Sequence, residues 1–194
     1  MAELLLFHHA HGLTPGVQSF ADELRAAGHI VHVPNLYNGK TFNELSDGVG
    51  YARQVGFDTI LERGLRTADG LPREVVHAGF SLGVMPAQKL AQTRAGTRGA
   101  LFFHACLPPS EFGDAWPQDV PVQIHITEGD EWAQEGDLDA GRQLATSSEA
   151  AELFLYPGDR HLFSDSSLPD YDEAASALLK KRVFGFLERV DSRR

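Results

Sequence analysis

Hydrophobic residues occur along the chain in short runs that alternate with longer amphipathic stretches. Each run is rich in Val, Ile, Leu or Phe and has turn residues near its ends. Runs this short and this apolar are typical of parallel strands that are buried on both faces. The predicted strands are residues 4–8, 30–34, 74–78, 100–105, 120–126 and 152–156.

The stretches between these runs have the spacing of helices that bury one face. Residues 17–27 end at Gly28, a residue type that commonly terminates helices, and residues 42–65 predict one helix or two, interrupted near Gly56. Further helices are predicted at residues 82–93, 138–145 and 171–190. This regular alternation predicts an α/β fold with a mostly parallel sheet of about six or seven strands, covered by helices on both faces. We expect one domain over residues 1–194.

Composition excludes several classes of protein. The 194 residues are 42% hydrophobic and 23% charged, which is ordinary for a globular chain. A net charge of −10 argues against nucleic-acid binding, which requires basic clusters. The single cysteine, Cys106, cannot form an intrachain disulfide and fits a reducing cytoplasm, and no apolar run is long enough to span a membrane. The pattern leaves open whether the protein is a monomer or a homodimer.

The sequence Gly79-Phe80-Ser81-Leu82-Gly83 lies between a predicted strand and a predicted helix. Gly-x-Ser-x-Gly in this context is the pattern of a nucleophile elbow, a sharp turn that exposes a serine hydroxyl at the end of a sheet. The bare motif occurs readily by chance in a chain with 19 glycines, so the strand-turn-helix context is what makes it informative. We expect Ser81 to be a nucleophile.

A serine hydroxyl needs a base that removes its proton and an acid that orients the base. Where such an elbow is used, the chain order is often Ser, then Asp or Glu, then His, each after a strand. Asp130 and His161 follow the two later strands in this order and are the predicted acid and base. Asp137 is the main rival for the acid, although its position before a predicted helix is more simply that of an N-cap. Asp159 is interpreted as a turn residue, and Glu128 also lies at a strand end.

A run of histidines follows the first predicted strand. His8, His9 and His11 resemble a metal cluster, but alternation along a strand places His8 and His9 on opposite sides, so we expect no metal and no cofactor. We expect the backbone of this stretch, and not its histidine side chains, to take part in the chemistry, as a hydrogen-bond donor. The N–H groups of Leu82 and Ala10 are the predicted oxyanion hole.

With these residues placed, the chain resembles the dienelactone hydrolase family of α/β hydrolases. The resemblance covers essentially the whole chain and rests on residues 31–37, the elbow, the acid loop at Asp130 and the turn Gly158-Asp159-Arg160-His161. It implies a minimal, capless α/β-hydrolase fold and the hydrolysis of ester or lactone bonds through an acyl-enzyme.

Some family features are missing here. Well-studied members use cysteine where this chain has Ser81, and place a glutamate where it has His9 or, in a neighbouring alignment, Ala10. Two arginines of those members grip the substrate carboxylate; Gly39 (beside Lys40) and Asp165 stand at these positions. An aspartate in place of an arginine would repel a carboxylate. The resemblance thus implies that dienelactone itself is not the substrate.

These observations predict a serine hydrolase that acts on a small neutral or apolar ester, lactone or thioester. The alternative is a protein of the same fold that binds small molecules or acts as a scaffold without catalysis. The irregular segment 106–119 and several aromatic positions suggest a pocket wall. Candidate pocket residues are His9, Tyr37, Phe80, Phe112, Trp116 and Trp132.

Overall fold

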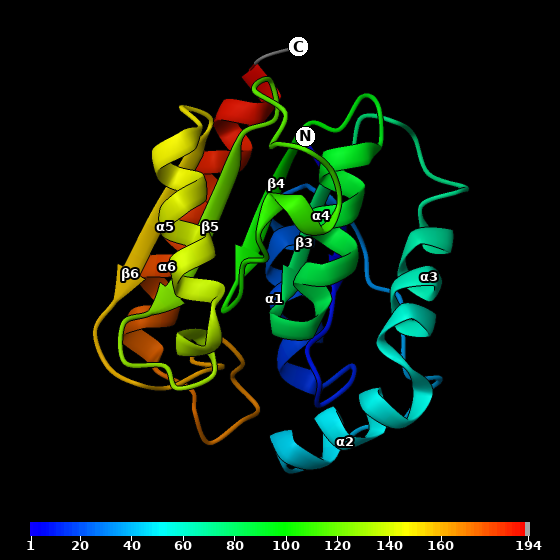
Figure 1. Ribbon diagram of the computed structural model, residues 1–194, viewed down its shortest axis with the longest axis vertical. Helices are drawn as coiled ribbons and strands as arrows, with labels where there is room; N and C mark the ends of the chain where they lie inside the picture. The colour runs from blue at the N-terminus through cyan, green and yellow to red at the C-terminus, as the bar shows by residue number, and fades with distance from the viewer. Residues whose placement is uncertain (193–194) are drawn as a thin grey trace.

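The structure, a computed structural model, describes residues 1–192 and contains a sheet of six parallel strands. The strand order is β2-β1-β3-β4-β5-β6, and the carboxyl ends of all strands therefore lie at one edge of the sheet (Figure 1). The strands are β1 (Glu3–Phe7), β2 (Ile30–His32), β3 (Val76–Phe80), β4 (Gly99–Phe103), β5 (Val122–Thr127) and β6 (Ala151–Tyr156).

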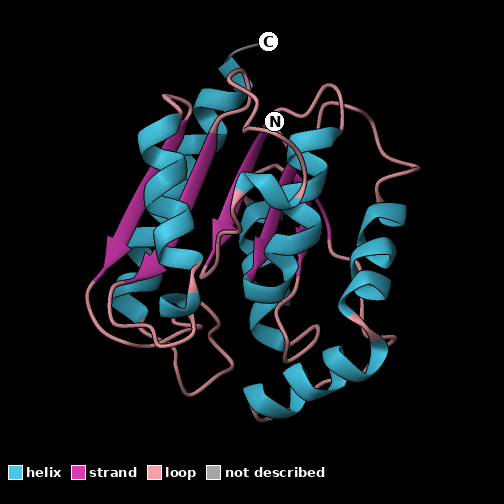
Figure 2. Ribbon diagram, in the orientation of Figure 1, coloured by secondary structure: helices cyan, strands magenta, loops and turns pink. Residues whose placement is uncertain are grey.

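Helices cover both faces of the sheet. They are α1 (Pro15–Ala26), α2 (Leu45–Val55), α3 (Phe57–Thr67), α4 (Val84–Thr93), α5 (Asp137–Ser147) and α6 (Glu173–Ser192). Residues of α1 and α6 share one buried cluster, and residues of α3, α4 and α5 share the other. Figure 2 shows that α2 lies beyond the arrowheads of the strands, near the edge where ligands of parallel sheets usually bind. No helix within residues 1–192 has the length and apolar character needed to cross a membrane.

The two clusters explain why the strands are apolar throughout instead of alternating. Leu4 and Leu6 of β1 pack with α1 and α6, whereas Leu5 and Phe7 face the opposite cluster. All four side chains have at most 1% of their surface exposed. A strand with a helix layer on each side has no polar face, as the pattern of short apolar runs predicted.

The predicted elements agree with the structure apart from their ends. The break near Gly56 is confirmed: this glycine has φ +93°, a left-handed value, and separates α2 from α3. The third strand runs two residues beyond its predicted end, to Phe80, so that Ser81 follows it directly. Segment 106–119 is irregular except for a short 3₁₀ turn, Pro109–Glu111.

Candidate active site

Ser81 lies at a sharp turn between β3 and α4. Its φ of +48° is in the left-handed region, which is uncommon for a residue with a side chain. The flanking glycines make the turn possible: a Cβ on Gly83 would lie 2.6 Å from the carbonyl oxygen of Phe7, and one on Gly79 would lie 2.1 Å from that of Gly83. The backbone of the elbow thus packs directly against the end of β1.

A chain of hydrogen bonds joins Ser81, His161 and Asp130. The Oγ of Ser81 is 2.8 Å from Nε2 of His161, and Nδ1 of His161 is 2.6 Å from Oδ2 of Asp130. Asp130 is fully buried, and its Oδ1 accepts the backbone N–H of Trp132 at 3.0 Å. Because an ionised carboxylate can only accept, His161 carries its proton on Nδ1 and offers Nε2 to the serine hydroxyl. The structure thus brings the three predicted residues together from loops after β3, β5 and β6.

The rival carboxylates make other contacts. Asp137 accepts the backbone N–H of Cys106 at 2.8 Å, and burial raises the pKa of its carboxyl group to about 6. It is the first residue of α5, whose N-cap is Gly136, so its interpretation as an N-cap was wrong. Asp159 and Glu128 are exposed.

Backbone donors lie beside the elbow. Leu82 follows Ser81 directly. Ala10 lies in the loop after β1, and the carbonyl oxygens of Phe7 and His8, where this loop begins, pack against Gly83. Within residues 1–192 no acceptor takes the N–H of Ala10, while the carbonyl of Ala10 packs against Gly48 of α2. Because the N–H of Ala10 has no acceptor among the described residues and its peptide is packed in place, it can donate to an oxygen that becomes negatively charged.

Three of the predicted pocket residues belong to the core instead. Phe80 is 1% exposed and packs against Phe20 and Phe103 on the α1 side. Tyr37 is fully buried and its hydroxyl donates to the carbonyl of Gly48 at 3.1 Å. Trp116 packs on the sheet and lines a groove of about 640 Å³ next to the C-terminal half of α5, near the amino ends of the strands. All three have at most 3% of their surface exposed.

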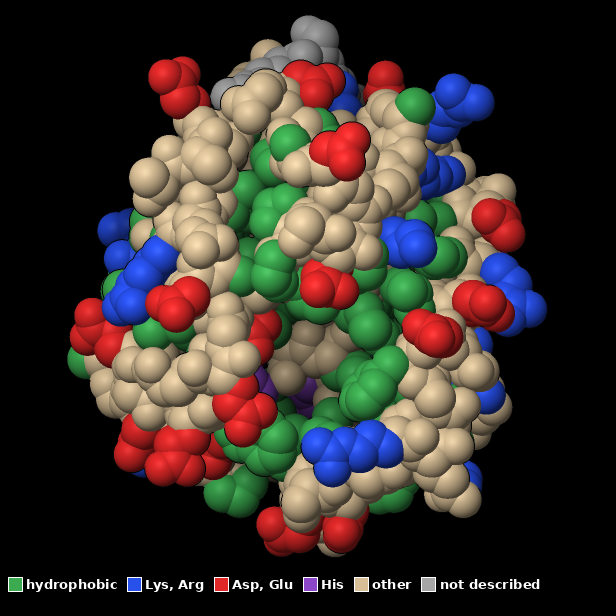
Figure 3. Space-filling view, in the orientation of Figure 1, with side chains coloured by type: hydrophobic (Ala, Val, Ile, Leu, Met, Phe, Trp, Pro, Cys, Tyr) green, Lys and Arg blue, Asp and Glu red, His purple; other side chains and the backbone are tan. Residues whose placement is uncertain are grey.

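The other pocket candidates differ in position. Trp132 is 43% exposed, its ring lies 6.1 Å from that of His161, and both line a groove of about 450 Å³. Phe112 is partly exposed beneath the ammonium group of Lys89, whereas His9 is fully buried. Figure 3 shows a hollow on this side of the molecule, with histidine at its floor and hydrophobic side chains around it.

Sequence reasoning assigned no role to several side chains near the site. Leu82 and Met85 in the first turns after Ser81 are partly exposed apolar side chains, as are Phe42 and Tyr51, whose rings are 5.2 Å apart. His104 directly follows β4 with φ +68°, and its ring lies 6.0 Å from that of His161. Its position at the carboxyl end of a strand was the signal that could have identified it.

Asp165 does not act as its position in the sequence suggested. The carboxylate is 2% exposed and accepts hydrogen bonds from His9, Thr14 and Ser167. A buried carboxylate with these partners does not face a substrate, so the expected direct repulsion of a substrate carboxylate is corrected to the loss of an attraction.

Comparisons with known proteins agree with this architecture. The sequence profile of the dienelactone hydrolase family matches residues 3–191. A dienelactone hydrolase-like promiscuous phosphotriesterase from metagenomic libraries superposes with a TM-score of 0.74 at 19% identity, over 98% of this chain and 87% of that one. A putative hydrolase of the alpha/beta superfamily from Xanthomonas campestris pv. campestris gives 0.61 at 22% identity, over 95% and 99%.

Thermogutta terrifontis esterase 2, in a structure phosphonylated by sarin, gives a TM-score of 0.70 at 13% identity, over 97% of this chain and 84% of that one. No curated protein gives a match. At these identities the solved structures show that the chain has the α/β-hydrolase fold.

Proposed function

Because the chain belongs to the dienelactone hydrolase family, we propose that it cleaves a carboxylic ester, lactone or thioester through an acyl-enzyme on Ser81. The family and its esterase-like structural neighbours support an ester-hydrolase role. The observation that carries the serine mechanism is the hydrogen-bonded chain from Ser81 through His161 to Asp130.

In this mechanism the Oγ of Ser81 attacks the substrate carbonyl carbon while Nε2 of His161 takes the hydroxyl proton. Asp130 holds the imidazole in the required tautomer and stabilises the imidazolium that forms. The N–H groups of Leu82 and Ala10 donate to the carbonyl oxygen as it becomes an oxyanion. As the tetrahedral intermediate collapses and its bond to the leaving group breaks, His161 protonates the departing oxygen or sulfur, which becomes an alcohol, a thiol or, for a lactone, the hydroxyl end of the acyl chain. Water, activated by His161, attacks the acyl-enzyme in the same way and releases the acid.

The surroundings of His161 favour an uncharged substrate. The adjoining groove contains the carboxylates Glu131, Asp159 and Asp170, and its guanidinium group, Arg160, donates to the carbonyl of Tyr171. Trp132 supplies an apolar wall there, and Leu82 and Met85 supply partly exposed apolar surface beside the elbow. Phe112 contacts Lys89 and is a weaker candidate for the wall.

An ester that carries a carboxylate is therefore expected to be a poor substrate. We expect kcat/KM for p-nitrophenyl butyrate to exceed that for the p-nitrophenyl monoester of succinate by at least about 10-fold. The reason is that the carboxylates of Glu131, Asp159 and Asp170 along the groove repel the anionic substrate. The ratio of the two kcat/KM values should shrink as salt is added, because salt screens exposed charges. It should also shrink in Glu131→Gln, which removes one exposed carboxylate from the groove. Equal turnover of the two esters, or turnover of dienelactone at the rate of the neutral ester, would contradict this prediction.

A fluorophosphonate tests the proposed mechanism without any assumption about the substrate. It phosphonylates serines that are activated by a base, and we expect peptide mass spectrometry to find the label on Ser81 alone. Ser81→Ala should abolish labelling and His161→Ala should reduce it to background, whereas Ser110→Ala, which removes an exposed serine, should leave it unchanged. Folded wild-type protein that takes up no label would refute the serine mechanism and favour a protein that binds small molecules without catalysis.

A further inference from the structure

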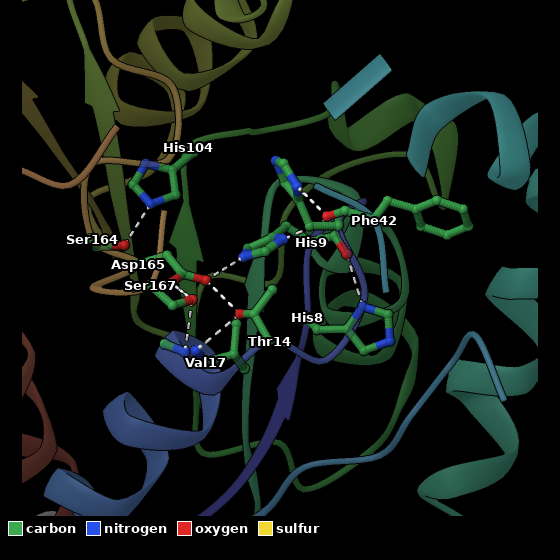
Figure 4. Close-up of polar contacts among 11 residues, drawn as sticks. His8, His9, Thr14, Val17, Phe42, His104, Ser164, Asp165 and Ser167 are labelled. Carbon is green, nitrogen blue, oxygen red and sulfur yellow. Dashed lines mark hydrogen bonds and ion pairs between the residues drawn. The ribbon is translucent and has the colours of Figure 1, made fainter. Parts of the chain in front are cut away.

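His9 is a fully buried histidine in the loop that follows β1, and the proposed chemistry assigns it no step. Each of its ring nitrogens has a partner. Nε2 lies 2.7 Å from Oδ2 of Asp165, and Nδ1 lies 3.3 Å from the backbone nitrogen of His11 (Figure 4). His9 thus connects a residue four positions after His161 with the loop that contains Ala10.

Asp165 accepts hydrogen bonds from three residues, two in the loop after β1 and one close to it in the chain. Its Oδ2 also accepts the hydroxyl of Thr14 at 2.5 Å, and its Oδ1 accepts the backbone N–H and hydroxyl of Ser167 at 2.8 and 2.6 Å. Thr14 caps α1, whose N-terminus favours negative charge. A Cβ on Gly16 would lie only 1.6 Å from Oδ1, so the first turn of α1 is shaped around this carboxylate.

These contacts determine where His9 carries its proton. Burial raises the pKa of Asp165, but the hydrogen bonds from His9, Ser167 and Thr14 hold it well below its usual range, so the carboxyl group is ionised. Burial also lowers the pKa of His9, which is therefore neutral. A neutral histidine that donates from Nε2 has an unprotonated Nδ1, and Nδ1 can then accept the N–H of His11.

The same residue holds the backbone on both sides of Ala10. The carbonyl of His9 accepts the N–H of Gly12 at 3.0 Å, while the ring of His9 holds the N–H of His11. The N–H of Ala10 between them is left without an acceptor in the described part of the chain. Phe7 lies opposite Gly79 in the sheet, so this loop emerges directly beside the elbow.

We propose that His9 is a positioning residue: with Nε2 bound to Asp165 and Nδ1 bound to the N–H of His11, it orients the Ala10 N–H toward the oxyanion. This inference rests on the proposed function. It assigns the pair His9–Asp165 the task of linking the loop that carries the base with the loop that carries the second oxyanion donor. Neither residue touches the substrate.

Two substitutions separate the two hydrogen bonds that the His9 ring makes, one with Asp165 and one with the N–H of His11. In His9→Gln the side-chain amide can still donate to Asp165 but leaves the His11 N–H without its acceptor. In His9→Asn the amide oxygen can replace Nδ1, while the bond to Asp165 is lost. We expect kcat to fall about 100-fold in His9→Gln and about 10-fold in His9→Asn, with KM within about twofold of wild type.

A tetrahedral inhibitor distinguishes this role from a general loss of stability. The affinity for a trifluoromethyl ketone, which forms an oxyanion adduct with an active serine, should fall in parallel with kcat/KM in both His9 variants. The matched control is His125→Asn, which removes another fully buried histidine, bonded at 2.8 Å to the hydroxyl of Tyr156. It should lower the melting temperature while leaving kcat and ketone affinity within about twofold.

Wild-type kcat and ketone affinity in His9→Gln, or losses no larger than those of His125→Asn, would overturn the inference. A measurement on the wild type covers the case in which the His9 variants do not fold. The ¹⁵N shifts of the His9 ring should show a protonated Nε2 and a bare Nδ1 between about pH 7 and about pH 8, and a proton on Nδ1 would overturn the inference. Absence of fluorophosphonate labelling in wild type would instead refute the proposed function, so the two failures are distinguishable.

Discussion

Asp130→Asn is expected to lower kcat for a neutral p-nitrophenyl ester by about 10⁴-fold. The amide can donate to Nδ1 of His161 and thereby favour the tautomer that has its proton on Nε2. That tautomer cannot accept the proton of Ser81, although the 2.8 Å and 2.6 Å spacings of the triad would be preserved. The measurement is steady-state kinetics near neutral pH, with the rate of phosphonylation as a second readout.

Asp137→Asn is the matched control, because it removes a carboxylate close in sequence while its amide oxygen can still accept the Cys106 N–H. We expect kcat within about tenfold of wild type, since Asp137 makes no hydrogen bond with His161 among the described residues. A loss of about 10⁴-fold in Asp137→Asn together with a small effect of Asp130→Asn would assign the orienting acid to Asp137. Comparable large losses in both would mean that the two carboxylates act as a unit.

Acid is expected to destabilise the fold steeply below about pH 6.5. Burial lowers the pKa of His77 and His125 to about 3 and that of His8 to about 4, so these side chains stay neutral in the folded protein. In the unfolded chain they bind protons near pH ~6.5, and the unfolded state therefore gains protons as the pH falls. Each contributes a loss of about 1.4 kcal/mol in the free energy of unfolding per pH unit between its unfolded and folded pKa values.

Asp137 works in the opposite direction. Burial raises its pKa from 3.8 to about 6, so between these values the folded state binds the additional proton and gains stability on acidification. The three histidines lose roughly 4 kcal/mol per pH unit and Asp137 returns about 1.4 kcal/mol, so these four groups alone contribute a net loss of roughly 3 kcal/mol per unit between about pH 6 and pH 4. The lowered pKa values of His9 and His104 act in the same direction as those of the three histidines. Since domains are stable by only about 5–15 kcal/mol, this loss is large.

Urea unfolding at several pH values from about 7.5 to about 5 measures the effect. His77→Leu is the informative variant, because neither ring nitrogen of His77 has a hydrogen-bond partner within residues 1–192. It should flatten the dependence of the free energy of unfolding on pH by about 1.4 kcal/mol per unit and make the protein more stable than wild type at pH ~5. A slope identical to that of wild type would show that His77 is protonated in the folded state.

Features set by neighbours in the chain could be predicted from the sequence. The break at Gly56 and the turn at Ser81 depend on backbone conformations that glycine permits or that flanking glycines allow. The parallel sheet follows from apolar runs that have no polar face. The order of Ser81, Asp130 and His161 after three strands of the sheet predicted their meeting, because parallel strands end at one edge.

Features that depend on which surfaces meet could not be predicted in this way. Phe80, Tyr37 and Trp116 had the composition of a pocket wall, yet the structure packs them into the core. Asp165 had the charge of a group that repels a substrate carboxylate, yet its donors come from residues as distant in the chain as Thr14 and His9. A side chain's type says which partners it can accept, whereas its burial and its actual partners follow from the packing of the whole chain.

The sequence by itself therefore determined the order of strands and helices, the elbow at Ser81, and the chain order in which a serine, an acid and a histidine follow the strands. Only the tertiary structure decided which carboxylate meets His161, which aromatic residues remain accessible, and that His8, His9 and His11 each bind a different partner. The physical reason is range: backbone turns and strand periodicity are local, but a buried hydrogen bond exists only where two distant segments are brought to within about 3 Å of each other.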